Sequence, residues 1–263
     1  MCGHRHRKER PMIGHFVHGT GAVRAIALHG WFSDSEAFAP MLRALDPTTL
    51  SIAFMDGRGY GRSRDLDGPF DMATLAADAI ALADHLGWNR FTLIGHSMGG
   101  KAALAAAIRA PGRVERICGI TPVWAAPAPF DPDTLGFFRS AAASIGARQA
   151  ILHNTTGGRL PVAWSQGAAE RSAAISTATA FAAYLESWAL DDFASAARNI
   201  DQPTLVIAGR HDVGVPEDWI RQSWLASLPQ AELTVLPEAG HYPMDECPLI
   251  LAATLTDFLM AAR

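Results

Sequence analysis

The sequence predicts an α/β fold, in which helices flank a mostly parallel β-sheet. Three observations support this prediction: short apolar runs recur along the chain, segments of helical periodicity lie between most of them, and proline or glycine ends or opens the helical segments. Strands that alternate with helices indicate βαβ units, and such units build parallel sheets. With 263 residues, of which 49% are hydrophobic and 18% charged, the chain can form one large domain around a sizeable core.

Six short apolar runs are predicted to be buried strands, at residues 23–28, 50–55, 91–95, 114–120, 204–209 and 232–236. Three further segments have helical patterns. Residues 75–87 place their apolar side chains on one face, residues 98–110 are apolar nearly all round, and residues 248–262 open with a proline that suits a first helical turn. The helix at 98–110 is therefore expected to pack against the sheet.

The alternation of strands and helices breaks between residues 122 and 199. Alanine, proline and aromatic residues are frequent there, and no strand pattern occurs. Apolar side chains recur at helical spacing over residues 181–188, which indicates packing against the rest of the protein. We predict three parts: an N-terminal tail with a possible first strand at 1–19, a core made of 20–121 and 200–263, and a helical cap at 122–199 over the carboxyl ends of the strands.

Composition and charge narrow the classes of partner. The net charge of −4 gives no reason to expect nucleic acid, and the basic residues before Pro11 are interpreted as a solvated terminus. The three cysteines show no paired spacing, and four histidines in or near the tail lack the rigid geometry of a metal site. Because no signal sequence or membrane-spanning run is found, we expect a cytoplasmic monomer or homodimer without membrane partners.

One short stretch carries a chemical signal. Residues 92–104 read TLIGHSMGGKAAL, so a G-x-S-x-G motif at 95–99 lies between a predicted strand and a predicted helix. A serine on such a tight turn projects its Oγ above the sheet, and the flanking glycines let neighbouring backbone approach. The helix N-terminus behind the turn offers free N–H groups to a developing negative charge. Ser97 is therefore predicted to be a nucleophile.

A serine hydroxyl needs a base that takes its proton. Of the ten histidines, His241 is the preferred candidate, because it lies in a loop after the last predicted strand, with Gly240 before it and Pro243 after it. A loop histidine exposed to solvent is the alternative interpretation. His96 adjoins Ser97, but its side chain is expected to leave the turn in another direction.

The base in turn needs a carboxylate that orients it. Asp212 lies just past the strand predicted at 204–209, whereas no acid directly follows the preceding strand. The chain order is then nucleophile, acid, base. Asp212 could instead cap a helix or close a turn, and the nearby Glu217 and Asp218 are expected to open the next helix.

An oxyanion intermediate needs two N–H donors. One is predicted to be the backbone of Met98, directly after the nucleophile, and the other that of Trp31, in the loop after the strand at 23–28. The His-Gly pair before Trp31 also suits an ordinary turn. The glycine-rich run at 54–63 lacks the ending of a phosphate-binding loop, so Asp56 and Arg58 are expected to tie loops together beside the site.

Together these motifs resemble the α/β-hydrolase fold family, in its esterase, lipase and lactonase branch. Over residues 20–262 the motifs occur in the family's order: LHGWFSDSEAF, MDGRGYGRS, GHSMGGKAA, GRHDVGVP and AGHYPMDECP. The resemblance implies a central, mostly parallel sheet of eight strands, a cap inserted after the sixth strand, and no cofactor.

The motifs and the resemblance predict a serine carboxylic ester hydrolase that acts on a small to medium apolar or aromatic ester through an acyl-enzyme. Carbon–carbon bond hydrolases, lactonases and perhydrolases use the same triad and remain open, and a ligand receptor with a vestigial triad is the non-enzymatic alternative. By family position and apolar character, seven aromatic residues are candidates for the walls of the substrate pocket: Trp31, Phe32, Trp124, Phe130, Phe137, Phe138 and Trp164.

Basic residues near the predicted site have two interpretations. Four arginines of the predicted cap could hold an acidic substrate, although a solvated face is the simpler interpretation for most of them: Arg139, Arg148, Arg159 and Arg171. Lys101, on the helix after the nucleophile, is interpreted as one partner of a structural ion pair.

Overall fold

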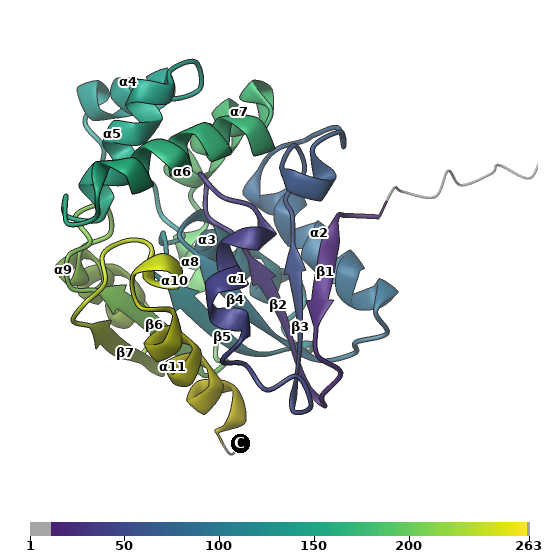
Figure 1. Ribbon diagram of the computed structural model, residues 1–263. Coiled ribbons are helices and arrows are strands. Elements are labelled where there is room, and N and C mark those ends of the chain that lie inside the picture. Colours follow the sequence, from purple (N-terminus) through teal and green to yellow (C-terminus); the bar gives the residue numbers. More distant parts are fainter. Residues whose placement is uncertain (1–11, 262–263) are drawn as a thin grey trace, which may run out of the picture.

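The computed structural model describes residues 12–261, and within them one seven-stranded sheet forms the centre of the molecule (Figure 1). The strand order across the sheet is β1-β3-β2-β4-β5-β6-β7; β1 runs antiparallel to β3, and every other neighbouring pair is parallel. The mostly parallel α/β fold is thereby confirmed. In chain order the strands are β1 (His15–His18), β2 (Val23–Leu28), β3 (Leu50–Met55), β4 (Phe91–His96), β5 (Val114–Ile120), β6 (Thr204–Gly209) and β7 (Ala231–Leu236).

The six predicted strands are all present, each with bounds within one residue of those expected. The number of strands differs: the described residues form seven where the resemblance implied eight, because they supply one strand, β1, beyond β3 at that edge of the sheet. The helical insertion accordingly follows the fifth strand in chain order, β5, and not the sixth. The parallel register brings the carboxyl ends of β2, β4, β6 and β7 to one edge, where the loops that follow them meet.

Helices cover both faces of the sheet (Figure 1). On one face α2 (Met72–His85) packs against α3 (Met98–Arg109), and on the other α1 (Ala39–Leu42) contacts α11 (Pro248–Met260). The first turn of α2 is capped by Asp71, whose carboxylate accepts from the Thr74 N–H at 2.7 Å. Because α3 buries mainly alanine and glycine, it lies close to the strands on either side of it, β4 and β5.

The segment between β5 and β6 contains five helices and no strand of the sheet among the described residues. Figure 1 shows α4 to α7 gathered at one end of the sheet. The apolar stripe predicted at 181–188 lies on α7, where Phe181, Tyr184 and Leu185 are buried. The helices are α4 (Pro132–Ser140), α5 (Ile145–Thr155), α6 (Val162–Ile175), α7 (Ala178–Leu190) and α8 (Ala194–Ala197). The division of the chain into tail, core and cap stays a prediction.

Short elements complete the fold: η1 (Ser35–Phe38), η2 (Gly61–Ser63), α9 (Glu217–Ile220), the π-helical turn η3 (Arg221–Leu225) and α10 (Pro243–Glu246). The acidic pair expected to open a helix does so, because α9 begins at Glu217. Between residues 12 and 261, no helix is both long and apolar enough to cross a bilayer. The compartment and the oligomeric state stay predictions. Several residues of the sequence predictions lie outside the described residues: Cys2, His4, Arg5, His6, Arg7, Lys8 and Arg10.

Candidate active site

Ser97 occupies the turn between β4 and α3. Its backbone has φ 52° and ψ −116°, a conformation that costs a non-glycine residue free energy and is found at strained functional turns. The flanking glycines are required by close packing, since a Cβ on Gly95 would lie 2.3 Å from the Gly99 carbonyl oxygen and one on Gly99 would lie 2.3 Å from that of Leu28. The small residues of the motif are therefore the steric condition for placing this serine at the end of β4.

Three side chains from distant parts of the chain meet at this turn. The Ser97 Oγ lies 3.0 Å from Nε2 of His241, and Nδ1 of His241 lies 2.6 Å from an oxygen of Asp212. The other oxygen of Asp212 accepts from the N–H groups of Gly214 and Val215 at 2.8 and 2.9 Å. Because the carboxylate holds the Nδ1 proton, Nε2 is the acceptor for the serine hydroxyl. All three side chains are buried.

The loop that carries His241 is held by a buried carboxylate. Glu246, at the end of α10, accepts from the N–H of Gly240 at 2.8 Å and from that of Tyr242 at 3.0 Å. Burial raises the pKa of this carboxyl, while these two backbone N–H donors and Arg159 lower it. The N–H of His241 itself donates to the Thr155 carbonyl at 3.1 Å. The backbone on both sides of the imidazole is thus fixed by hydrogen bonds.

The carbonyl of His241 has two donors. His96 Nε2 lies 2.8 Å from it and the Thr121 hydroxyl 3.1 Å. Since a carbonyl accepts, His96 carries its proton on Nε2. Burial lowers the pKa of His96 to about 3, with a smaller contribution from the neighbouring His241, so the ring is neutral at physiological pH. His96, expected to leave the turn in another direction, supports the loop of His241.

The two predicted oxyanion donors border the serine. Within residues 12–261 the backbone N–H groups of Met98 and Trp31 have no protein acceptor. The loop of Trp31 is firmly held, because its carbonyl accepts from the Tyr60 hydroxyl at 2.9 Å and its indole N–H donates to the Phe181 carbonyl at 2.7 Å. Met98 directly follows Ser97 and Trp31 lines the same cavity as Ser97, while the role of their N–H groups in catalysis stays a prediction.

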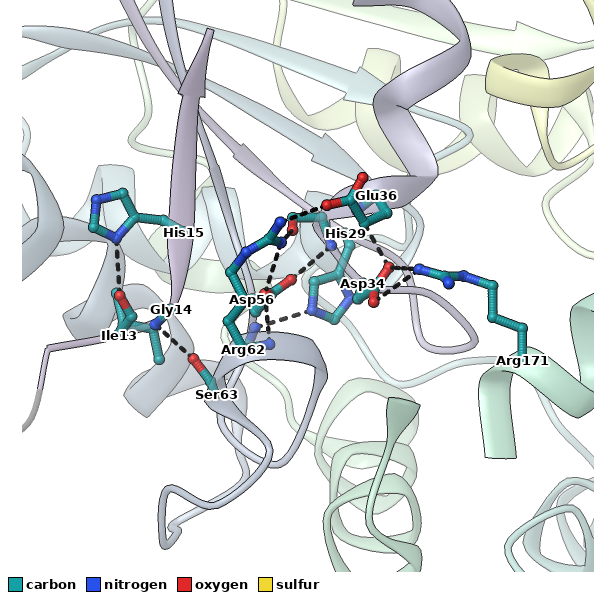
Figure 2. Close-up of polar contacts among 12 residues, drawn as sticks. Ile13, Gly14, His15, His29, Asp34, Glu36, Asp56, Arg62, Ser63 and Arg171 are labelled. Atoms are coloured by element: carbon teal, nitrogen blue, oxygen red, sulfur yellow. Dashed lines mark hydrogen bonds and ion pairs between the residues drawn. The ribbon is translucent and has the colours of Figure 1, made fainter. Parts of the chain in front are cut away.

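A polar network ties together the loops that follow β2 and β3 (Figure 2). The fully buried Asp56 accepts from the N–H groups of Ser35 and Arg62 at 2.7 and 2.8 Å. His29 Nε2 accepts from the Gly57 N–H at 2.9 Å, which leaves its Nδ1–H to donate to the carbonyl of Gly30. Arg58 pairs with Asp78 at 2.6 Å. Asp56 therefore connects the loops after β2 and β3, as expected, whereas Arg58 ties its loop to the helix α2.

A cavity of about 640 Å³ adjoins Ser97 and His241. Apolar and aromatic side chains make up most of its lining, with rings that pack on one another, such as Trp31 on Phe138 and Phe130 on Phe138. The loop after β6 supplies another part of the wall, and α4 and α5 supply several of the polar groups. Besides Ser97 and His241, the lining residues are Trp31, Phe32, His96, Val123, Ala128, Pro129, Phe130, Asp133, Thr134, Phe137, Phe138, Ile151, Asn154, Thr155, Trp188, Val213, Gly214, Val215, Pro216, Trp219 and Tyr242.

Two of the predicted wall residues lie elsewhere. Trp124 is buried beside Trp224, with ring centroids 5.4 Å apart, and forms part of the core. Trp164 packs against Tyr242 and donates its indole N–H to Asp245 at 3.2 Å. Neither residue lines the cavity, whereas Phe32 and Phe137 do. Which lining residues bind substrate stays a prediction.

Lys101 is not the ion-pair partner that we expected. Its ammonium is fully buried and donates to three backbone carbonyls, those of Ala126 and Trp188 at 3.0 Å each and that of Asp191 at 2.6 Å. Burial lowers the pKa of this lysine to about 8, against the opposing charges of Asp191 and Asp192. The carbonyls lie before α4 and at the end of α7, so Lys101 connects the helix of the nucleophile to both.

Sequence reasoning missed the residues that hold the base, Thr121, Thr155 and Glu246. Of these, Glu246 had a visible signal, because an acid five residues after a loop histidine can reach back to the N–H groups of that loop. Thr121 and Thr155 had none, since they act on His241 from more than eighty residues away in the sequence. In the part of the chain that the structure describes, no three His, Cys, Asp or Glu residues gather as a metal site would require.

Comparisons with known proteins agree with this architecture. The chain is 27% identical over 240 residues to a pimeloyl-[acyl-carrier protein] methyl ester esterase of Nitrosomonas europaea, covering 85% of this chain and 90% of that protein. It is 28% identical over 246 residues to a non-heme haloperoxidase of Rhodococcus erythropolis, covering 86% and 88%. An esterase structure from Exiguobacterium antarcticum superposes with a TM-score of 0.84 at 19% identity, covering 95% and 96%, a likeness of fold alone.

A family-level match covers most of the chain. The profile described as the alpha/beta hydrolase fold matches residues 26–248, which include Ser97, Asp212 and His241. The family and the relatives support hydrolase activity in general terms. The chain belongs to the alpha/beta hydrolase fold family.

Proposed function

We propose that this protein is a serine carboxylic ester hydrolase of the carboxylesterase type. The observation that carries the proposal is the buried chain of hydrogen bonds from Ser97 through His241 to Asp212, which ends beside an apolar cavity. A serine so paired can be deprotonated as it attacks, and a neighbouring apolar space can hold the substrate that is attacked. The esterase among its relatives supports the same class.

In the proposed acylation, Ser97 Oγ attacks the ester carbonyl carbon while His241 Nε2 takes the hydroxyl proton. Asp212 holds the imidazole in the Nδ1–H form and stabilises its cation. The N–H groups of Met98 and Trp31 donate to the oxyanion of the tetrahedral intermediate. When that intermediate collapses, the bond to the alkoxy group breaks, and His241 gives its proton to the departing alcohol.

Deacylation repeats these steps with water as the nucleophile. His241 takes a proton from water, the resulting hydroxide attacks the acyl-enzyme carbonyl, and the same two N–H groups hold the oxyanion. Collapse returns the proton to Ser97 and releases the carboxylic acid. The reaction as proposed needs no cofactor. The aromatic lining favours a small to medium apolar or aromatic ester as the substrate.

The test is a hydrolysis screen with 4-nitrophenyl esters of increasing acyl length, simple lactones and a vinylogous diketone. We expect ester turnover that Ser97→Ala abolishes, and a fluorophosphonate probe that labels Ser97 in the native chain. Ser140→Ala is the matched control, because Ser140 is exposed on α4 and does not line the cavity. Its activity should equal that of the native protein.

Other results of the screen would replace the proposal. Preferred turnover of lactones or of the diketone would mean that the same three residues cleave a lactone or a carbon–carbon bond. A folded protein without turnover and without a fluorophosphonate adduct on Ser97 would favour a ligand receptor instead of an enzyme.

A further inference from the structure

The cavity lining carries few charged side chains, and they are of one sign. Among the described residues that line it there is no lysine or arginine, and one carboxylate, that of Asp133. Asp133 lies in the first turn of α4 and is exposed to solvent. The adjoining wall is formed by apolar side chains of the same helix and the segment before it, Phe130 and Phe137 among them. A substrate in this cavity therefore meets aromatic rings, uncharged polar groups such as those of Thr134 and Asn154, and one negative charge.

The four arginines that could have held an acidic substrate are engaged elsewhere. Arg139 forms a bidentate pair with Glu186 at 2.7 and 2.8 Å, Arg159 pairs with Glu246 at 2.9 Å, and Arg171 pairs with Asp34 at 2.7 Å (Figure 2 shows the last of these). Arg148 is buried; it donates to the Ala141 carbonyl and to the hydroxyls of Ser172 and Ser176.

An anionic substrate would pay two penalties in this cavity. A carboxylate that leaves water for this largely apolar cavity loses solvation, and no lysine or arginine lines the cavity to compensate its charge. It would also be repelled by Asp133, and this repulsion weakens as salt screens it. A neutral ester incurs neither penalty. The surroundings of Ser97 therefore differ in charge from a site built to bind a dicarboxylic acid.

We propose that the cavity selects esters that carry no negative charge, and that Asp133 is a residue that sets this selectivity. The inference rests on the proposed ester hydrolysis and names the charge class of its substrates. It excludes half-esters of dicarboxylic acids and anionic diketones as preferred substrates. A purely structural role for Asp133, as an acid that stabilises the N-terminus of α4, would affect stability without changing the preference between substrates.

The experiment compares two substrates that release the same 4-nitrophenol, 4-nitrophenyl methyl adipate and 4-nitrophenyl hydrogen adipate, at pH 7.5 and low salt. The measured quantity is the ratio of kcat/KM for the neutral ester to that for the anionic one. We expect the native ratio to reach about 100, because the anionic ester loses solvation in a largely apolar cavity that has no lysine or arginine in its lining. Asp133→Asn should reduce the ratio about three- to tenfold, and Asp133→Lys should reduce it further.

Two controls isolate the charge of Asp133. Asp131→Asn removes the same charge two residues away, at the N-cap of α4 and outside the cavity lining, and asparagine also caps helices well. It should leave the ratio within about twofold of the native value. In the native protein, 0.5 M salt should shift the ratio toward that of Asp133→Asn, a readout that requires no variant to fold.

The outcomes separate this inference from the proposed function. Ser97-dependent turnover of both adipates at similar kcat/KM would overturn the charge selectivity and leave the esterase proposal standing. A large native ratio that Asp133→Asn and salt both leave unchanged would overturn the role of Asp133. No turnover of either ester would instead contradict the proposed function itself.

Discussion

Two regions beside the cavity are built in different ways: the floor, meaning Ser97, His241 and Asp212, and the wall, meaning the side chains of α4 that line the cavity. At the floor, Ser97, His241 and Asp212 are buried, and hydrogen bonds hold the backbone of the histidine at its N–H and its carbonyl. In the wall, α4 has no buried residue, and the exposed pair of Arg139 and Glu186 connects it to α7. Buried hydrogen bonds fix geometry more firmly than exposed ion pairs, which solvent screens.

The difference suggests a division of labour. Acyl transfer requires reacting atoms to be held within a few tenths of an ångström, and the floor has the hydrogen bonds to do this. Recognition of the rest of the substrate tolerates more movement, and we expect it to depend on the exposed and half-buried side chains of the wall. Substitutions at the floor should therefore lower kcat by orders of magnitude. Substitutions in the wall should change which esters are preferred.

The largest effect is expected at the floor. Asp212→Asn removes the carboxylate that holds the Nδ1 proton of His241, so the imidazole can adopt the wrong tautomer. We expect kcat to fall on the order of 10⁴-fold with little change in the fold, measured with a 4-nitrophenyl ester. Asp218→Asn, which changes an exposed acid on α9, is the control and should retain activity. Near-native kcat in a folded Asp212→Asn protein would mean that Asp212 is not the carboxylate on which the reaction depends.

The next effect concerns the connection between floor and wall. Lys101→Met leaves the carbonyls of Ala126, Trp188 and Asp191 without their donor. Because unpaired buried polar groups are costly, we expect the free energy of unfolding to fall by about 3 kcal/mol, measured by urea denaturation. Arg109→Met, which alters an exposed cation on the same helix, should cost less than about 1 kcal/mol. Equal losses in the two variants would mean that these three hydrogen bonds contribute little.

A further effect is expected only in acid. His96 stays neutral in the folded protein down to a pKa of about 3, whereas an unfolded histidine takes up a proton below about 6.5. As pH falls from 6.5 toward 3, the unfolded state alone gains this proton, so stability decreases by up to about 1.4 kcal/mol per pH unit. His96→Gln should flatten this part of the stability curve, while His85→Gln, at an exposed position, should not. If the free energy of unfolding changes equally between pH 6.5 and 3 in the native and His96→Gln proteins, the lowered pKa of His96 is contradicted.

The floor could be predicted from the sequence because its residues follow strands. Each of the six predicted strands is a mainly apolar run, and its bounds can be read to within about a residue. In a parallel sheet the residues just past those ends converge, so Ser97, Asp212 and His241 could be assigned to one edge. The meeting of their side chains agrees with that expectation, although their catalytic roles await the experiments above.

The wall could not be predicted in the same way. Which side of a helix faces the cavity depends on how α4 to α7 pack, and that packing rests on contacts between distant residues such as Arg148 and Ser176. Trp124 and Trp164 had the same apolar character as Phe137, yet they pack elsewhere. The three carbonyls that bind Lys101 come from positions 126, 188 and 191, and no local pattern connects them.

The smallest effect is expected in the wall. Arg139→Gln breaks the exposed pair with Glu186 that links α4 to α7, and exposed pairs contribute little to folding. The midpoint of thermal unfolding should therefore stay within experimental error of the native value. If the pair helps to place α4, KM for esters that reach Phe137 should change while kcat for short esters does not. Glu186→Gln should reproduce the result, because it breaks the same pair from α7. A large drop in the unfolding midpoint would show that the wall is held as rigidly as the floor, and the proposed division of labour would fail.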